Sequence, residues 1–148
     1  MSAIVVAPGE GRFIAVGSAG TGVTVKASSE ETGGLCSVWE GRVPPGTVGA
    51  GPHYHRGRDE FFYVLRGEVV LRIGHEKQPA PAGTFAFVPR GTVHGFHNAS
   101  PDEATLLVMH HPGGFEQFLE AMRELSLRNG SKDERAALVD RFDMIPVP

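Results

Sequence analysis

Short apolar runs, separated by glycine and proline, fill the first two-thirds of the chain. Val23 and Val25 alternate with Thr24 and Lys26, as in a strand with one buried and one solvated face. The pattern predicts strands at residues 12–16, 23–27, 35–43, 60–66, 68–73, 84–88, 93–98 and 104–110, with turns at 17–22 and 28–34 and a loop at 74–83. Many short strands separated by loops favour an all-β jelly roll or barrel over βαβ units.

The end of the chain changes character. Residues 115–127 carry apolar side chains at helical spacing, which predicts an amphipathic helix. Ser131 and Glu134 have the spacing of a capping box, so a second helix is expected to run to about Arg141. Short amphipathic helices need a surface on which to bury their apolar side, and we expect both to pack on the barrel. They act either as a structural lid or dimer brace, or as part of the substrate pocket.

Length and charge narrow the class of protein. A chain of 148 residues has the length of one domain, here residues 1–148, with a barrel at about 10–112 and a helical segment at about 113–142. The net charge of -3 gives no excess of positive charge of the kind that binds nucleic acid. The single cysteine, Cys36, excludes an internal disulfide. No signal peptide or membrane-spanning run is visible, so a cytoplasmic protein without a membrane or nucleic-acid partner is expected.

Two segments carry residues that suit a metal ion. His53 and His55 are two apart, so on a strand both imidazoles point to the same face. Glu60 follows after a polar turn, and His94 follows a Pro-Arg-Gly turn farther along the chain. Imidazole and carboxylate are ligands for a divalent transition metal, and they do not choose among Fe, Mn, Ni, Co, Cu and Zn. The alternative is that these are ordinary sheet histidines, which stack or form hydrogen bonds.

These segments resemble the paired signature of the cupin superfamily, small β-barrel proteins that bind a metal within the barrel. The residues that match the two motifs are His53, His55, Glu60 and Gly67, then Gly83, Pro89, Gly91, His94 and Asn98. Thr47 departs from the pattern, because glycine often stands there. The resemblance implies a cupin jelly-roll β-barrel (a double-stranded β-helix) with two short C-terminal α-helices packed on it. It also implies one divalent transition metal per chain, held by His53, His55, Glu60 and His94.

The outer parts of the chain resemble one subgroup, the small bacterial cupins similar to quercetin dioxygenase. The resembling stretches are residues 9–12, 31–34, 44–46 and 112–116. This similarity implies a metal-dependent dioxygenase that cleaves an enol-bearing or flavonoid-like small molecule, with Glu60 as both ligand and general base. Metal-dependent isomerases, lyases and decarboxylases use similar ligand sets, and a non-catalytic small-molecule binding module is a further alternative. Cupins of this kind commonly pair, so a homodimer is expected.

Strand parity predicts the lining of the pocket. Phe62 and Val64 share the side of Glu60, and Phe96 and Asn98 share the side of His94. An aromatic lining suits a planar aromatic or apolar substrate. The other histidines are interpreted as loop, packing or surface groups, namely His75, His97, His110 and His111.

Overall fold

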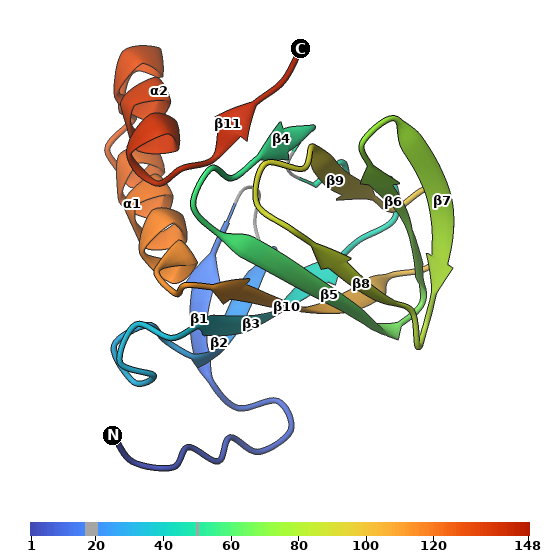
Figure 1. Cartoon of the computed structure of the whole chain (residues 1–148), viewed down its shortest axis with the longest axis horizontal. Coiled ribbons are helices and arrows are strands. Elements are labelled where there is room, and N and C mark those ends of the chain that lie inside the picture. Colours follow the sequence, from blue (N-terminus) through green and yellow to red (C-terminus); the bar gives the residue numbers. More distant parts are fainter. Residues whose placement is uncertain (17–20, 50) are drawn as a thin grey trace.

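Two antiparallel sheets face each other in the computed structural model, which describes residues 1–16, 21–49 and 51–148 (Figure 1). The larger sheet has the order β1 (Arg12–Ala15), β2 (Gly22–Ala27), β3 (Ser37–Val43), β10 (Ala104–His111), β5 (Asp59–Arg66) and β8 (Phe85–Val88). The smaller sheet has the order β11 (Ile145–Pro146), β4 (His53–Tyr54), β9 (His94–His97), β6 (Glu68–Ile73) and β7 (Glu76–Pro81). This arrangement is the predicted all-β jelly roll. Residues 17–20 of the predicted turn at 17–22 lie outside the described residues.

Alternating side chains of the larger sheet form much of the core. On β5 the inward residues Glu60, Phe62 and Val64 are buried, while Tyr63 between them is exposed. The central strand β10 pairs with β3 on one side and with β5 on the other. Its register with β5 places His110 opposite Glu60, so a polar pair lies inside an otherwise apolar layer.

The predicted loop at residues 74–83 is wrong, because residues 76–81 form the strand β7. Among the described strands, β7 pairs only with β6, at the edge of the smaller sheet. Proline has no backbone N–H to donate to a neighbouring strand. An edge strand has a neighbour on one side only, so β7 can contain Pro79 and Pro81. Only Ala80 of this strand is buried, so the apolar alternation that reveals other strands is missing here.

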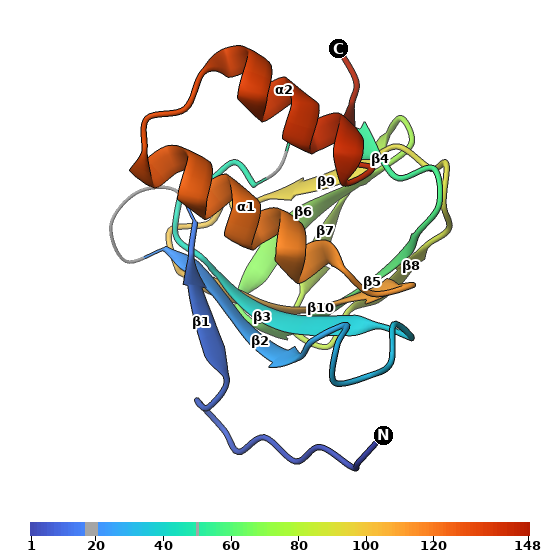
Figure 2. The same ribbon diagram turned by 90° about the vertical axis from the view of Figure 1, so that its left-hand side faces the viewer.

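The two predicted helices are confirmed as α1 (Phe115–Leu127) and α2 (Lys132–Arg141). The capping box is complete, since Ser131 Oγ accepts from the Glu134 amide at 3.2 Å and Glu134 Oε2 accepts from the Ser131 amide at 2.8 Å. The helices lie side by side against one flank of the sandwich (Figure 2). α1 buries apolar residues, whereas α2 has no fully buried residue. Within the described residues, neither helix combines the length and apolar character needed to cross a membrane.

The glycines at the two ends of β6, Gly67 and Gly74, generate a stability prediction. Gly67 and Gly74 both have positive φ, at 71° and 61°. A Cβ at Gly67 would lie 2.7 Å from the carbonyl oxygen of Glu103, whereas a Cβ at Gly74 would meet nothing within 4 Å. We expect Gly74→Ala to lower the free energy of unfolding by about 1 kcal/mol and Gly67→Ala by about 3 kcal/mol, because only the second adds a backbone clash. Urea unfolding of both variants measures the difference, and equal losses would contradict the account.

Candidate metal centre

Four buried side chains converge between the two sheets. β4 carries His53, the loop after it carries His55, β5 carries Glu60 and β9 carries His94. β4 and β9 pair directly, with His53 opposite His94. The four residues are exposed by 6%, 1%, 4% and 1%, and one possible ligand atom from each lies within 4.8 Å of the others. This cluster could hold a metal ion.

The three imidazoles share one hydrogen-bond pattern, in which each Nδ1 lies near a backbone carbonyl oxygen. The pairs are His53 with Gly51 (2.8 Å), His55 with Asp143 (2.6 Å) and His94 with Thr92 (2.9 Å). A carbonyl only accepts, so Nδ1 of a neutral ring donates and Nε2 keeps its lone pair. Nε2 of His94 and of His55 lie 2.6 and 3.2 Å from Glu60 Oε2. Lone pairs that face a carboxylate oxygen need a positive charge between them, either a second proton on the ring or a metal ion, so the residues fit a divalent metal.

Burial and mutual charge set the protonation of the cluster. Burial raises the pKa of Glu60, but the close imidazoles of His110, His55 and His94 outweigh it and hold that pKa well below its usual range. Burial lowers the pKa of His53 to about 4, and the neighbouring His94 adds to this. For His94, burial acts to lower the pKa, but the hydrogen bond and charge of Glu60 raise it overall. An ionised Glu60 and a neutral His53 are the forms that bind metal.

The segment after α2 orients His55. The backbone carbonyl of Asp143 accepts from His55 Nδ1, and its carboxylate accepts from the amides of Arg56 and Gly57, both at 2.8 Å. Asp143 was not among the expected site residues, because it lies 88 residues from His55 and belongs to no local motif.

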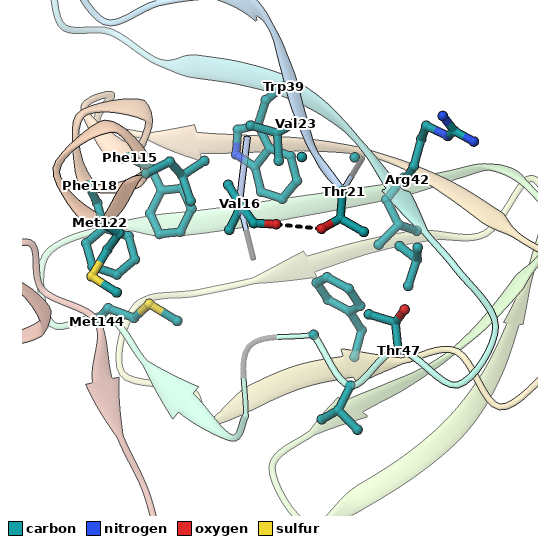
Figure 3. Close-up of a pocket in the computed structure, with 18 of the residues that line it drawn as sticks. Val16, Thr21, Val23, Trp39, Arg42, Thr47, Phe115, Phe118, Met122 and Met144 are labelled. Atoms are coloured by element: carbon teal, nitrogen blue, oxygen red, sulfur yellow. Dashed lines mark hydrogen bonds between the residues drawn. The ribbon is translucent and has the colours of Figure 1, made fainter. Parts of the chain in front are cut away.

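An apolar cavity of about 700 Å³ reaches the cluster, since His53 and Glu60 form part of its wall. Figure 3 shows Phe115, Phe118 and Met122 of α1 on one side of this cavity, with Met144 nearby. Most of the wall is aromatic, aliphatic or methionine. Its apolar residues with large side chains include Val16, Val23, Trp39, Val43, Val48, Phe62, Phe96, Leu106, Phe115, Phe118, Leu119, Met122, Val139 and Met144.

The predicted pocket residues fall into two groups. Phe62 and Phe96 line the cavity. Val64 and Asn98 were also expected there, but neither belongs to its described wall. Val64 is 1% exposed in the core, and Asn98 Nδ2 donates to the carbonyl oxygens of Val43 and Asp102 at 2.8 and 2.7 Å. The alternation of side chains along a strand predicts the face on which each residue lies. It does not predict how far along the strand the cavity extends.

Two further parts of the chain contribute to the site. The sequence left the role of the first one open and did not place the second one in the site. The apolar stripe of α1 lines the cavity through Phe115, Phe118 and Met122, which is one of the two roles expected for this helix. His110, interpreted as a packing or surface group, is fully buried, and its Nε2 lies 3.3 Å from Glu60 Oε1. His75 lies in a turn and is exposed, as expected.

Comparison with known proteins identifies the family. Residues 39–110 match the family model of the cupin domain, and this stretch contains all four possible ligands. A solved structure described as a sugar phosphate isomerase from a cupin superfamily, from Silicibacter pomeroyi, is 29% identical with a TM-score of 0.53, over 60% of this chain and 59% of that one. The chain belongs to the cupin superfamily.

Relatives of this cupin do not point to one reaction. A structure described as a predicted oxalate decarboxylase, from Thermotoga maritima, is 25% identical with a TM-score of 0.59, over 62% of this chain and 80% of that one. An uncharacterized protein of Aquifex aeolicus is 39% identical over 61 residues, 41% of this chain and 50% of that protein. The chain spans about half the length of the curated relatives it matches. Because one scaffold hosts many functions, the family does not fix the reaction.

Removing one imidazole tests the cluster. We expect His55→Ala to weaken the binding of a divalent metal more than about 100-fold, beyond the usual effect of losing an outer-shell partner. The barrel should stay folded, because its apolar core is elsewhere. His97→Ala, which removes a half-buried histidine outside the cluster, is the control. Titration with Co²⁺ and circular dichroism check both points. Wild-type affinity in His55→Ala would rule out this ligand set.

The turn before β9 gives a prediction on pH. Arg90 donates three hydrogen bonds to the Asp59 carboxylate, at 2.8 to 3.0 Å, and these hold the pKa of Asp59 at about 2. This value lies below the ordinary 3.8, so the ionised carboxylate stabilises the fold above about pH 4 and loses that effect as the pH falls through 2. Asp59→Asn should therefore lower the free energy of unfolding at pH 7, by about 1 kcal/mol because the pair is partly screened by solvent.

Urea unfolding of the wild type and Asp59→Asn between pH 7 and pH 2 measures this contribution. The difference between the two proteins should shrink below about pH 4. A difference that stays constant over the whole range would mean that the carboxylate charge is not responsible.

Proposed function

We propose that this cupin is a metal-dependent dioxygenase that cleaves an apolar, enol-bearing small molecule such as a flavonol. The observation that carries the proposal is the apolar cavity of about 700 Å³ whose wall includes His53 and Glu60. Its volume lies in the usual range for sites of small organic molecules, which are mostly apolar with a few polar groups that fix orientation.

The aromatic residues of the wall favour a planar substrate. Phe62 and Phe96 lie edge to face, with ring centroids 6.1 Å apart, and Phe115 and Phe118 lie 5.4 Å apart. Such rings gain stacking and edge contacts with an aromatic ligand in addition to the burial of its apolar surface. A flat aromatic molecule with one enol group is therefore the substrate class that the cavity accommodates best.

Glu60 is the natural general base. It is the only carboxylate among the described residues of the cavity wall, and its depressed pKa keeps it ionised at neutral pH. Its carboxylate would accept the proton of the substrate hydroxyl, while the apolar wall excludes water and orients the ring. A bound divalent metal would supply Lewis acidity toward the deprotonated substrate and redox chemistry with dioxygen. His53, His55, Glu60 and His94 would hold that metal.

A metal-dependent decarboxylase, isomerase or lyase is the second candidate, supported by the activities named for the two similar structures. Oxalate and sugar phosphates are small anions, which need several charged or hydrogen-bonding groups around them. Two arginines reach the described wall, and one of them, Arg42, already binds Glu103 at 2.8 and 3.0 Å. Arg135 of α2 is the other. This scarcity of polar groups favours the apolar substrate.

Oxygen uptake tests the proposal. Protein is loaded in turn with Fe²⁺, Mn²⁺, Ni²⁺, Co²⁺, Cu²⁺ or Zn²⁺, and at least one of these forms should consume dioxygen with flavonols or related enols, above the rate of the metal alone. Oxalate and a sugar phosphate serve as comparison substrates. Turnover of these anions without oxygen uptake would replace the proposal by the second candidate. Flavonol binding without any turnover would leave a binding module.

The wall gives a matched pair of variants. Phe96→Ala should lower kcat/KM for a flavonol by about 10-fold, because it removes apolar contact area from the cavity. Phe87→Ala makes the same chemical change on β8, at a side chain that is 50% exposed and outside the described wall, so its kinetics should match those of the wild type. Equal effects of the two changes would exclude this cavity as the substrate site.

The proposed partners are this small molecule and dioxygen. A homodimer stays a prediction from the sequence.

A further inference from the structure

His110 is a buried imidazole that belongs to neither cupin motif. It is fully buried near the end of β10, and the strand registers place it opposite Glu60 on β5 and Ser37 on β3. Its Nε2 lies 3.3 Å from Glu60 Oε1. This Nε2 completes no hydrogen bond of good geometry within the described chain, and Glu60 is the acceptor in ion-pair range.

Trp39 determines which nitrogen of His110 carries the proton. The indole Nε1 of Trp39 donates to His110 Nδ1 at 3.4 Å. Indole is only a donor, so Nδ1 acts as the acceptor and the proton of the neutral ring lies on Nε2, which faces Glu60. Phe115 stacks on the imidazole with centroids 4.0 Å apart and an interplanar angle of 11°, which fixes the plane of the ring.

The two oxygens of Glu60 therefore have different surroundings. Oε2 lies beside Nε2 of His94 and His55, which are possible metal ligands, at 2.6 and 3.2 Å. Oε1 faces the N–H of His110. We propose that His110, oriented by Trp39, is a positioning residue that holds Oε1 of Glu60 and leaves Oε2 to bind the metal.

This role differs from that of a ligand. His110 is outside the group of four residues whose ligand atoms come together, and it is outside the described wall of the cavity. It acts behind Glu60, as outer-shell partners do when they orient a metal-binding carboxylate. The inference rests on the metal site and is independent of the proposed reaction.

Two substitutions of His110 separate positioning from packing. His110→Leu removes the N–H and keeps an apolar side chain, whereas His110→Gln keeps an N–H donor. We expect His110→Leu to weaken Co²⁺ binding about 10- to 100-fold, the usual effect of losing an outer-shell partner. His110→Gln should recover most of this loss. The dissociation constant is measured by competition with a chelator, well below the melting temperature, and the visible spectrum of bound Co²⁺ reports its coordination.

Trp39→Phe provides a second test if His110→Leu fails to fold. It keeps an aromatic ring beside His110 but loses the indole N–H, so the tautomer with a bare Nε2 becomes accessible. We expect Co²⁺ binding to weaken about 3- to 10-fold, as for the loss of one hydrogen bond. His111→Gln is the control, because this neighbouring histidine is exposed and bonds to the Leu35 carbonyl at 2.7 Å.

A packing role predicts a different outcome. The variants would then change the melting temperature, while the affinity of the folded protein for Co²⁺ and the Co²⁺ spectrum stayed those of the wild type. That result would overturn the proposal, as would a His110→Gln variant that binds no better than His110→Leu. Failure of the wild type to bind Co²⁺ would also overturn it. None of these outcomes depends on oxygen uptake, so a failure here is distinguishable from a failure of the proposed function.

Discussion

The buried charge of Glu60 is the constraint on which the rest of the site depends. An ionised carboxylate that is 4% exposed is costly unless its oxygens are paired. The larger sheet supplies Glu60 itself and His110, while strands of the smaller sheet supply His53 and His94. The two layers are therefore joined across the core by one polar cluster. A cation bound among its nitrogen and oxygen atoms would offset the cost of burying the negative charge of Glu60.

The apolar surroundings give this cluster its chemical use. Away from water, charges interact more strongly, so a carboxylate and three imidazoles in fixed positions can act strongly on a bound molecule. The cavity extends from this polar region along Phe62 and Phe96 to the side chains of α1. A substrate that fills it must present a polar group to Glu60 and apolar surface elsewhere. A cavity with one polar end and an otherwise apolar wall favours an apolar enol over a small anion as the substrate. The set of possible metal ligands says less about the substrate, because many cupins share it.

Local patterns reveal some parts of the site and miss others. The positions of His53, His55 and Glu60 follow from their spacing on one stretch of chain, so sequence alone could bring them together. β7 could not be found, because an edge strand with prolines and one buried residue has no alternation. His110 and Asp143 depend on packing between distant segments, β10 against β5 and the segment after α2 against the His55 loop. Parity also cannot say that Asn98 bonds to backbone carbonyls beyond the end of β9 instead of lining the cavity.

Metal stoichiometry is the most direct measurement of the central claim, that these four residues form a metal centre. Native mass spectrometry of the purified chain, before and after incubation with each divalent ion, would report the number of ions bound. The account predicts about one ion per chain, with the bound protons released as the ion enters. A chain that takes up no ion under any loading condition would contradict it, and the cluster would then be a hydrogen-bonded group of the core.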